Sequence, residues 1–187
     1  ARGHFIDSPV FGLGYQTHTQ WGITDIGGGF DYFPGEYADF WIGSIHLGGT
    51  FSDHKISPMD FFPGYDTSLE YITNEDGSQT LVTPVTNPVI NMARLLQSLD
   101  ADGDPKQGIS ITEPVVYCFE TAMAESGYEA LHFTEGGQIE DILEATQEAC
   151  YGVEGVTLNI VSYEDAKANL DKALDSNMFR KNVSKTP

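Results

Sequence analysis

The chain has 187 residues, of which 40% are hydrophobic and 12% aromatic, so it is long enough to bury a substantial core and is not a disordered segment. Its 28 acidic and 9 basic residues give a formal net charge of -19, which repels nucleic acids and anionic membrane surfaces. We therefore expect no nucleic-acid partner. We also expect no membrane span, because no apolar run reaches about 18 residues.

Residues 1–86 show the pattern of β structure. Aromatic and β-branched residues recur there in short runs separated by Gly, Pro and Asp, which make tight turns between strands. We expect residues 1–10 to form an extended arm and residues 51–65 to form a loop that closes an open end of the sheet. The predicted strands are residues 14–19, 22–25, 29–33, 37–42 and 44–47, followed by a hairpin of residues 69–73 and 79–83 that turns at Asp76-Gly77.

Residues 87–176 show the spacing of amphipathic helices instead. Three helices have start signals, which are Asn87-Pro88, Thr112-Glu113-Pro114 and Ser162, and another helix covers about residues 139–149. Val156–Val161 alternates in hydrophobicity and predicts one returning strand. We therefore predict an α+β fold, with a small antiparallel β-sandwich followed by a helical portion that contains this strand.

The end of the chain, residues 177–187, is a basic tail. Five basic and two acidic residues occur in residues 167–187, whereas the rest of the chain is strongly acidic. Two interpretations remain open: a frayed terminus, or a segment that docks on the acidic body of a neighbouring copy. The sequence starts at Ala1 rather than Met, so we expect either a cleaved leader or a trimmed terminus.

Several short motifs in the first 112 residues occur in a recognisable order. They are FIDSPVFGLGYQT, GITDIGGGFDYFPGE and FWIGSIHLGG, followed by NMARLLQSLDADGDPKQGISI. This order resembles a module found in bacterial exported and surface-attached proteins, including adhesin-like proteins and lipoproteins. The resemblance covers about residues 5–112 and implies export and a surface location rather than an activity. Gly27-Gly28-Gly29 departs from it, since a polar residue usually precedes the Phe, so we expect a looser hairpin there.

Three aspartates alternate in the segment LDADGDP. Asp100, Asp102 and Asp104 resemble the first half of a calcium loop, in which successive carboxylates surround one hard cation. The EF-hand pattern is incomplete, because Pro105 replaces its Gly and Ile111 replaces its bidentate Glu. A solvated Asp-rich turn is the alternative, although anions at a helix C-terminus are disfavoured. The predicted cofactor is calcium, with the ligands Asp100, Asp102, Asp104, the carbonyl of Lys106, and Glu113.

Cys118 and Cys150 are the only cysteines, and they do not belong to a CxxC or Cys/His metal motif. We predict a disulfide that connects two neighbouring helices and contributes roughly 3–4 kcal/mol in the chain-entropy model. Two independent buried thiols are the alternative. A disulfide would indicate an oxidising compartment.

Candidate interaction residues fall into two groups. The run FIDSPV could lie along the sheet edge of a neighbouring molecule by strand addition, through Phe5, Ile6 and Val10. Eight aromatic residues occur between Tyr15 and Trp41, and alternation directs some of them outward. The helical portion covers these side chains, or they form an interaction surface. The outward candidates are Trp21, Tyr37 and Trp41.

Known catalytic motifs are absent from the sequence: it contains no GxSxG, P-loop or HExxH pattern, and its five histidines are dispersed. Four carboxylates, Asp25, Asp31, Glu36 and Asp39, fall in a range where two could have glycosidase spacing, but chance proximity is expected among 28 acids. We expect the protein not to be an enzyme.

Together these patterns predict an exported, extracellular or cell-surface protein with a structural or adhesive role. We expect a homo-oligomer, of which a self-assembling filament is one form, stabilised by calcium and the disulfide. The alternative is a secreted carbohydrate-binding or glycan-hydrolysing module that stacks sugars on its outward aromatics. A periplasmic domain that binds another protein is a third possibility.

Overall fold

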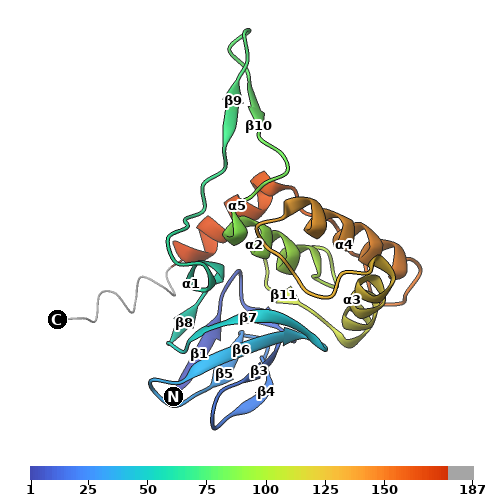
Figure 1. Cartoon of the computed structure of the whole chain (residues 1–187). Helices are drawn as coiled ribbons and strands as arrows, with labels where there is room; N and C mark the ends of the chain where they lie inside the picture. The colour runs from blue at the N-terminus through green and yellow to red at the C-terminus, as the bar shows by residue number, and fades with distance from the viewer. Residues whose placement is uncertain (177–187) are drawn as a thin grey trace, which may run out of the picture.

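The computed structural model describes residues 1–176 and has the predicted α+β fold (Figure 1). The predicted basic tail, residues 177–187, lies outside the described residues. The strands are β1 (Arg2–Phe5), β2 (Val10–Phe11), β3 (Gly14–Gln16), β4 (Trp21–Ile23), β5 (Gly29–Asp31), β6 (Tyr37–Ile42), β7 (Ile45–Phe51), β8 (Lys55–Ile56), β9 (Tyr71–Thr73), β10 (Gln79–Leu81) and β11 (Ile109–Ser110). The helices are α1 (Pro58–Phe61), α2 (Pro88–Ser98), α3 (Glu113–Ser126), α4 (Gly136–Ala149) and α5 (Tyr163–Leu174).

Two small sheets form the β portion, with strand orders β5-β1-β8 and β4-β3-β6-β7. All neighbouring strands are antiparallel except β1 and β8, which are parallel. Aromatic rings from the two sheets meet: Phe5 and Phe30 pack edge-on against Phe40, with ring centroids 5.2 and 5.3 Å apart. Such pairs add to the burial energy of the rings. The two sheets therefore pack as a small sandwich around an aromatic centre.

The segment expected to be a closing loop contains regular structure. It holds β8 and the short helix α1, which Ser57 and Asp60 cap reciprocally. Phe61 packs against Phe5 and Phe40, with ring centroids 5.5 and 6.0 Å apart. The segment thus covers the aromatic centre, as expected, although with more order than the sequence indicated.

Helices α2, α3 and α5 begin where the sequence predicts, whereas α4 begins at Gly136, three residues before its predicted start. The side chain of Asn87 accepts a hydrogen bond from the N–H of Val89 at 3.0 Å, and Pro88 occupies the first turn of α2. Ser162 caps α5 in the same way by accepting from the N–H of Asp165 at 3.1 Å. Helix α2 is buried along its whole length because it contacts α1, α4 and α5. None of the helices within residues 1–176 is long and apolar enough to cross a membrane.

The predicted returning strand at Val156–Val161 is wrong. The N–H of Thr157 donates to the carbonyl of Ala101 at 2.8 Å, and the N–H of Val161 donates to Ser98 Oγ at 3.0 Å, but no strand is assigned here. Leu158 is buried while its neighbours Thr157 and Asn159 are exposed. An extended segment that packs on one side alternates in hydrophobicity whether or not another strand pairs with it.

The N-terminal segment is not a separate arm. Phe5, Ile6 and Val10 are buried, with exposed fractions of 0%, 1% and 0%. Strand β1 lies inside the molecule's own sheet, and β2 pairs in parallel with β11, where Val10 faces Ile109. These residues therefore fill the core of their own chain instead of presenting a surface to a neighbour.

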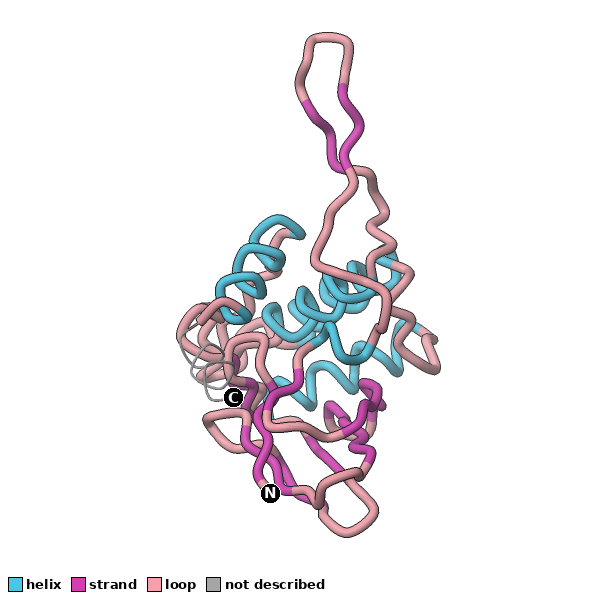
Figure 2. Tube along the Cα trace, turned by 90° about the vertical axis from the view of Figure 1, so that its left-hand side faces the viewer, coloured by secondary structure: helices cyan, strands magenta, loops and turns pink. Residues whose placement is uncertain are grey.

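One hydrophobic core includes residues from both parts of the chain, from Phe5 to Leu158. The change near residue 86 thus marks a change of secondary structure, and the β and helical parts share their interior. The hairpin β9–β10 is the exception, because it extends away from the rest of the molecule in both views (Figures 1 and 2).

Candidate functional site

The projecting hairpin exposes apolar side chains yet has an ordered tip. Tyr71 and Ile72 are 44% and 58% exposed. At the tip, the N–H of Asn74 donates to the carbonyl of Ser78 at 2.7 Å, and the N–H of Gly77 donates to the carbonyl of Asn74 at 3.0 Å. Gly77 has a φ of +85°, which explains the predicted Asp-Gly turn. The tip is thus a defined turn.

The base of the hairpin is fixed to two helices. The side-chain N–H groups of Asn87, which caps α2, donate to the carbonyls of Asp66 and Ser68 at 3.0 and 2.8 Å. Thr67 Oγ1 donates to Asp171 Oδ1 of α5 at 2.6 Å. Both ends of the hairpin are therefore held, and its direction is set by α2 and α5.

Both outer edges of the hairpin have unpaired main-chain groups. The N–H of Val82 donates to the carbonyl of Glu70 at 2.9 Å, so these two residues face each other within the ladder. In an antiparallel pair such residues alternate with residues whose N–H and C=O point outward. Tyr71 and Leu81 are outward residues by this rule. No other described strand pairs with β9 or β10.

Strand β4 forms a second open edge, at the end of the four-stranded sheet. Trp21 and Ile23 on this strand are 78% and 62% exposed. Beside them lies a groove made of two adjoining hollows of about 790 and 670 Å³, which share Gly14, Ile23 and Gly43. The aromatic residues along this groove are Phe11, Tyr15, Trp21, Trp41 and Tyr117, of which Tyr15 is buried with its ring against Phe30.

The three predicted outward aromatics thus have different surroundings. Trp21 is exposed at the β4 edge, and Trp41 is half-buried in the same groove. The His46 ring packs against Trp41 at an interplanar angle of 55°, with ring centroids 5.3 Å apart. Tyr37 is 48% exposed and contacts the exposed ring of Phe51, with ring centroids 5.4 Å apart. The structure brings Trp21 and Trp41 together, whereas Tyr37 forms a separate pair.

The acidic loop after α2 contains one buried carboxylate. Asp100 has an exposed fraction of 0%, and its Oδ1 accepts a hydrogen bond from the N–H of Ser110 at 2.8 Å. Its other oxygen, Oδ2, is buried, and no N–H or hydroxyl group within residues 1–176 donates to it. Burial, together with the neighbouring Asp102 carboxylate, raises the pKa of Asp100 to about 7. Hydrogen bonding to Asp100 lowers the pKa of Asp102.

Of the other predicted calcium ligands, Asp102 lies against the Asp100 carboxyl group, whereas Asp104 and Glu113 have other surroundings. Asp102 and Asp104 are exposed, and Asp104 Oδ1 accepts from the N–H of Lys106 at 3.3 Å. Glu113 is exposed at the first turn of α3, where it lines the groove. Within residues 1–176, no three His, Cys, Asp or Glu side chains are arranged to hold a metal ion. Calcium binding stays a prediction, with Asp100 and Asp102 as the pair that the fold brings together.

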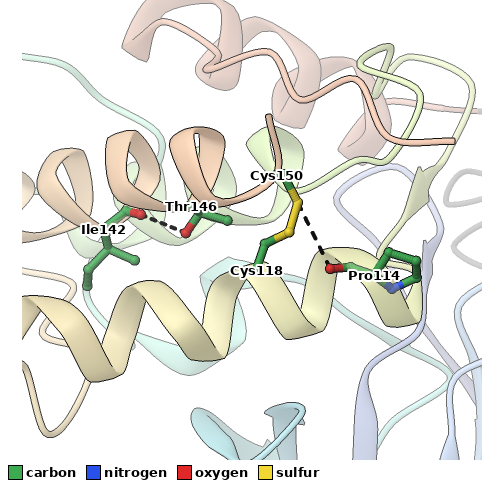
Figure 3. Close-up of a disulfide and its surroundings, with 5 residues drawn as sticks. All are labelled: Pro114, Cys118, Ile142, Thr146 and Cys150. Carbon is green, nitrogen blue, oxygen red and sulfur yellow. Dashed lines mark hydrogen bonds between the residues drawn. A yellow bond between two sulfur atoms is a disulfide. The ribbon is translucent and has the colours of Figure 1, made fainter. Parts of the chain in front are cut away.

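The predicted disulfide is present (Figure 3). Cys118 in α3 is bonded to Cys150 at the end of α4, with the two Cα atoms 5.5 Å apart, so the bond connects two packed helices. The Sγ of Cys150 lies 4.0 Å from the carbonyl oxygen of Pro114. Because an oxidised sulfur has no hydrogen to donate, this is a packing contact. Thr146 Oγ1 donates to the carbonyl of Ile142 at 2.7 Å, which satisfies a buried hydroxyl beside the bond.

The carboxylates considered for glycosidase chemistry have structural partners. Arg2 forms ion pairs with both Asp25 and Asp31, and the N–H of Gly29, more than Arg2, lowers the pKa of Asp25. Asp39 Oδ1 lies 2.9 Å from His46 Nε2. Asp25, Asp31 and Asp39 thus each have an ionic partner on a neighbouring strand or segment.

A buried polar network around Asp7 was not predicted. Asp7 is 1% exposed, and its Oδ1 accepts from Gln97 Nε2 at 2.9 Å. Gln97 also donates to the carbonyl of Ala166 at 3.0 Å and accepts from Asn169 Nδ2 at 2.9 Å. Burial raises the pKa of Asp7 well above its usual range. Isolated polar residues in three distant segments have no spacing signal that could have revealed this network.

Comparison of the chain with protein-family models, with curated proteins and with solved structures found no match. The resemblance to exported bacterial surface modules therefore remains a prediction from the sequence motifs.

Proposed function

We propose that the protein is a structural protein of the cell exterior that assembles with copies of itself through hairpin β9–β10. The observation that carries this proposal is the ordered hairpin, which extends from the body with two open edges and exposed apolar side chains. The disulfide and the sequence resemblance support an extracellular location.

Strands β9 and β10 pair with each other and with no other strand of residues 1–176, so the projecting part of the hairpin is a two-stranded ribbon. A two-stranded ribbon alone is marginally stable in water, and open edges are usually protected by charged residues or proline. The outer edge of β10, Gln79–Leu81, contains neither. A ribbon with this edge, fixed at its base and projecting into solvent, is suited to pair with a strand of another molecule.

The edge of β4 in a second copy is the best-matched partner strand. The N–H of Thr17 donates to the carbonyl of Gln20 at 2.7 Å, which places Gln20 toward β3. The alternation of the ladder therefore directs the main-chain groups of Trp21 and Ile23 outward. Residues 20–24 carry no charge, like the edge of β10. Apolar cross-strand pairs between the two edges would each add about 0.2–1 kcal/mol.

Such a contact joins two different surfaces, so it is heterologous. Heterologous contacts repeat from copy to copy and give either a closed ring or an open filament.

Point variants at both surfaces test the proposal. We expect Leu81→Lys and Ile23→Lys each to abolish assembly, because each places a charge on one of the paired edges. Ile26→Lys is the matched control, since Ile26 is 87% exposed but lies in the turn after β4. Sedimentation velocity and electron microscopy of the intact protein provide the measurement. Equal assembly of all three variants, or a monomeric wild type at every concentration, would contradict the proposal.

Carbohydrate binding is the second candidate, because Trp21 and Trp41 line one groove. Aromatic side chains gathered beside a groove form a surface on which sugar rings can stack. A glycan array with the wild type and Trp41→Ala separates the two candidates. Glycan binding that Trp41→Ala abolishes and Leu81→Lys preserves would favour this function, and no binding to any glycan would reject it.

A further inference from the structure

We infer that the acidic loop at the end of α2 binds calcium, with the carboxylates of Asp100 and Asp102 as its charged ligands. The inference does not depend on self-assembly, since it uses neither the hairpin nor the β4 edge.

The buried oxygen of Asp100 is the observation that points to a ligand. Asp100 is fully buried, Oδ1 is satisfied by the N–H of Ser110, and no N–H or hydroxyl group of the described residues donates to Oδ2. Leaving a buried carboxylate oxygen unpaired is unfavourable. Asp102 is within hydrogen-bonding contact of this carboxyl, so two acidic groups share one small space. A hard divalent cation between them would pair the orphaned oxygen and remove the repulsion.

Hydrogen bonds within the protein hold the loop around this pair in place. The N–H of Gly103 donates to the carbonyl of Asp100 at 3.1 Å, and Asn159 Nδ2 donates to the carbonyl of Gly103 at 3.0 Å. Gly103 has a φ of +74°, and a Cβ there would lie 2.4 Å from Asn159 Nδ2. The main chain therefore needs glycine at this position. The backbone that carries the two carboxylates is held in one conformation by these contacts.

The available donors favour calcium over magnesium. Calcium accepts 6–8 oxygen ligands in flexible geometry, whereas magnesium demands a near-ideal octahedron and retains its waters. The loop offers two carboxylates in contact, so water and main-chain carbonyls complete the shell. Asp104 is exposed in the same loop and can turn toward the ion. An ion with few charged ligands is bound with modest affinity.

An ion at this position would join the two parts of the fold. The loop connects the end of α2 to β11, and β11 pairs with β2 of the β portion. The carbonyl of Ala101 in the loop accepts from Thr157, which follows the disulfide at Cys150. Calcium would therefore stabilise the junction between the sheets and the helices.

Calorimetry of the full chain in chelator and in excess calcium tests the site. At a calcium concentration about a hundredfold above Kd we expect Tm to rise by about 5–10 °C, with a smaller rise in equal magnesium. Asp100→Asn and Asp102→Asn should lose this rise. Asp141→Asn, an exposed acid on α4, should retain it and so controls for general screening of the negative charge. Titration calorimetry should show one calcium ion per wild-type chain and none with Asp102→Asn.

Three results would overturn the inference. One is that the scans in chelator and in calcium superimpose. Another is that Asp141→Asn loses the response as fully as Asp102→Asn, which would indicate diffuse screening. The third is that Asp100→Asn is stabilised in chelator while the wild type ignores calcium, which would mean that the two carboxyl groups share a proton. The monomeric variant Leu81→Lys should bind calcium like the wild type, so failure of assembly and failure of this site are distinguishable.

Discussion

At the scale of single residues, Asp7 makes the stability of the fold depend on pH. Burial raises the pKa of Asp7. In the folded protein Asp7 therefore keeps its proton above about pH 4, whereas in the unfolded chain it loses its proton there. Stability therefore falls as pH rises from the ordinary carboxyl pKa toward the raised one. We expect Asp7→Asn to flatten this decline and to stabilise the protein at pH 7 by about 1–3 kcal/mol, because it removes a buried ionisable group.

Thermal unfolding at several pH values between 4 and 8 measures this effect. Wild type and Asp7→Asn should converge near pH 4 and separate as pH rises. The exposed Asp141 again provides a control, and Asp141→Asn should follow the wild-type curve. Curves for Asp7→Asn that run parallel to the wild type would show that Asp7 does not carry the pH dependence.

The sequence predicted the place of a residue correctly where the conformational preference of that residue alone determines the local structure. The Asp-Gly turn and the Asn87 cap follow from the preferences of those residues alone, and both are present. The contacts of Asp7 with Gln97 depend on segments 90 residues apart, which no local pattern encodes. The aspartate spacing likewise suggested Asp100 and Asp102 as candidate ligands, but the burial of Asp100 arises from tertiary packing around the loop and could not be read from that spacing.

At the scale of elements, the disulfide connects α3 and α4 and closes a loop with a sequence separation of 32. Closing a loop of this length reduces the entropy of the unfolded chain by an amount worth roughly 3–4 kcal/mol. We expect the double variant Cys118→Ala, Cys150→Ala to lower Tm by about 6–16 °C. Scans with and without reductant check the cause: the wild type in reductant should approach the variant, and the variant itself should not respond.

The sequence predicted a helix or strand correctly where its pattern is compatible with one type of element only. Helices α2 and α5 have caps as well as periodicity, so their ends were clear. The stretch Val156–Val161 has alternation alone, which reports one-sided burial and does not reveal whether a neighbouring strand exists. Residues 1–10 appeared unattached in the sequence because their partners, β5, β8 and β11, follow much later.

At the scale of the whole molecule, the net charge of -19 opposes any assembly of identical copies. The Debye length is about 30 Å at 0.01 M salt and about 8 Å at 0.15 M, so repulsion between copies is strong in dilute buffer and largely screened near physiological ionic strength. The edges proposed to pair, β4 and β10, are uncharged and should depend little on salt themselves. Salt should therefore strengthen assembly by weakening repulsion between the bodies.

We accordingly expect the assembled fraction of the wild type to rise with sodium chloride between 0.01 and 0.15 M, as measured by sedimentation velocity at fixed protein concentration. Leu81→Lys should remain monomeric at every salt concentration, because screening cannot restore a lost strand pair. An assembled fraction that falls with salt would mean that opposite charges hold the copies together. The contact would then have to involve basic residues rather than the neutral strand edges of β4 and β10.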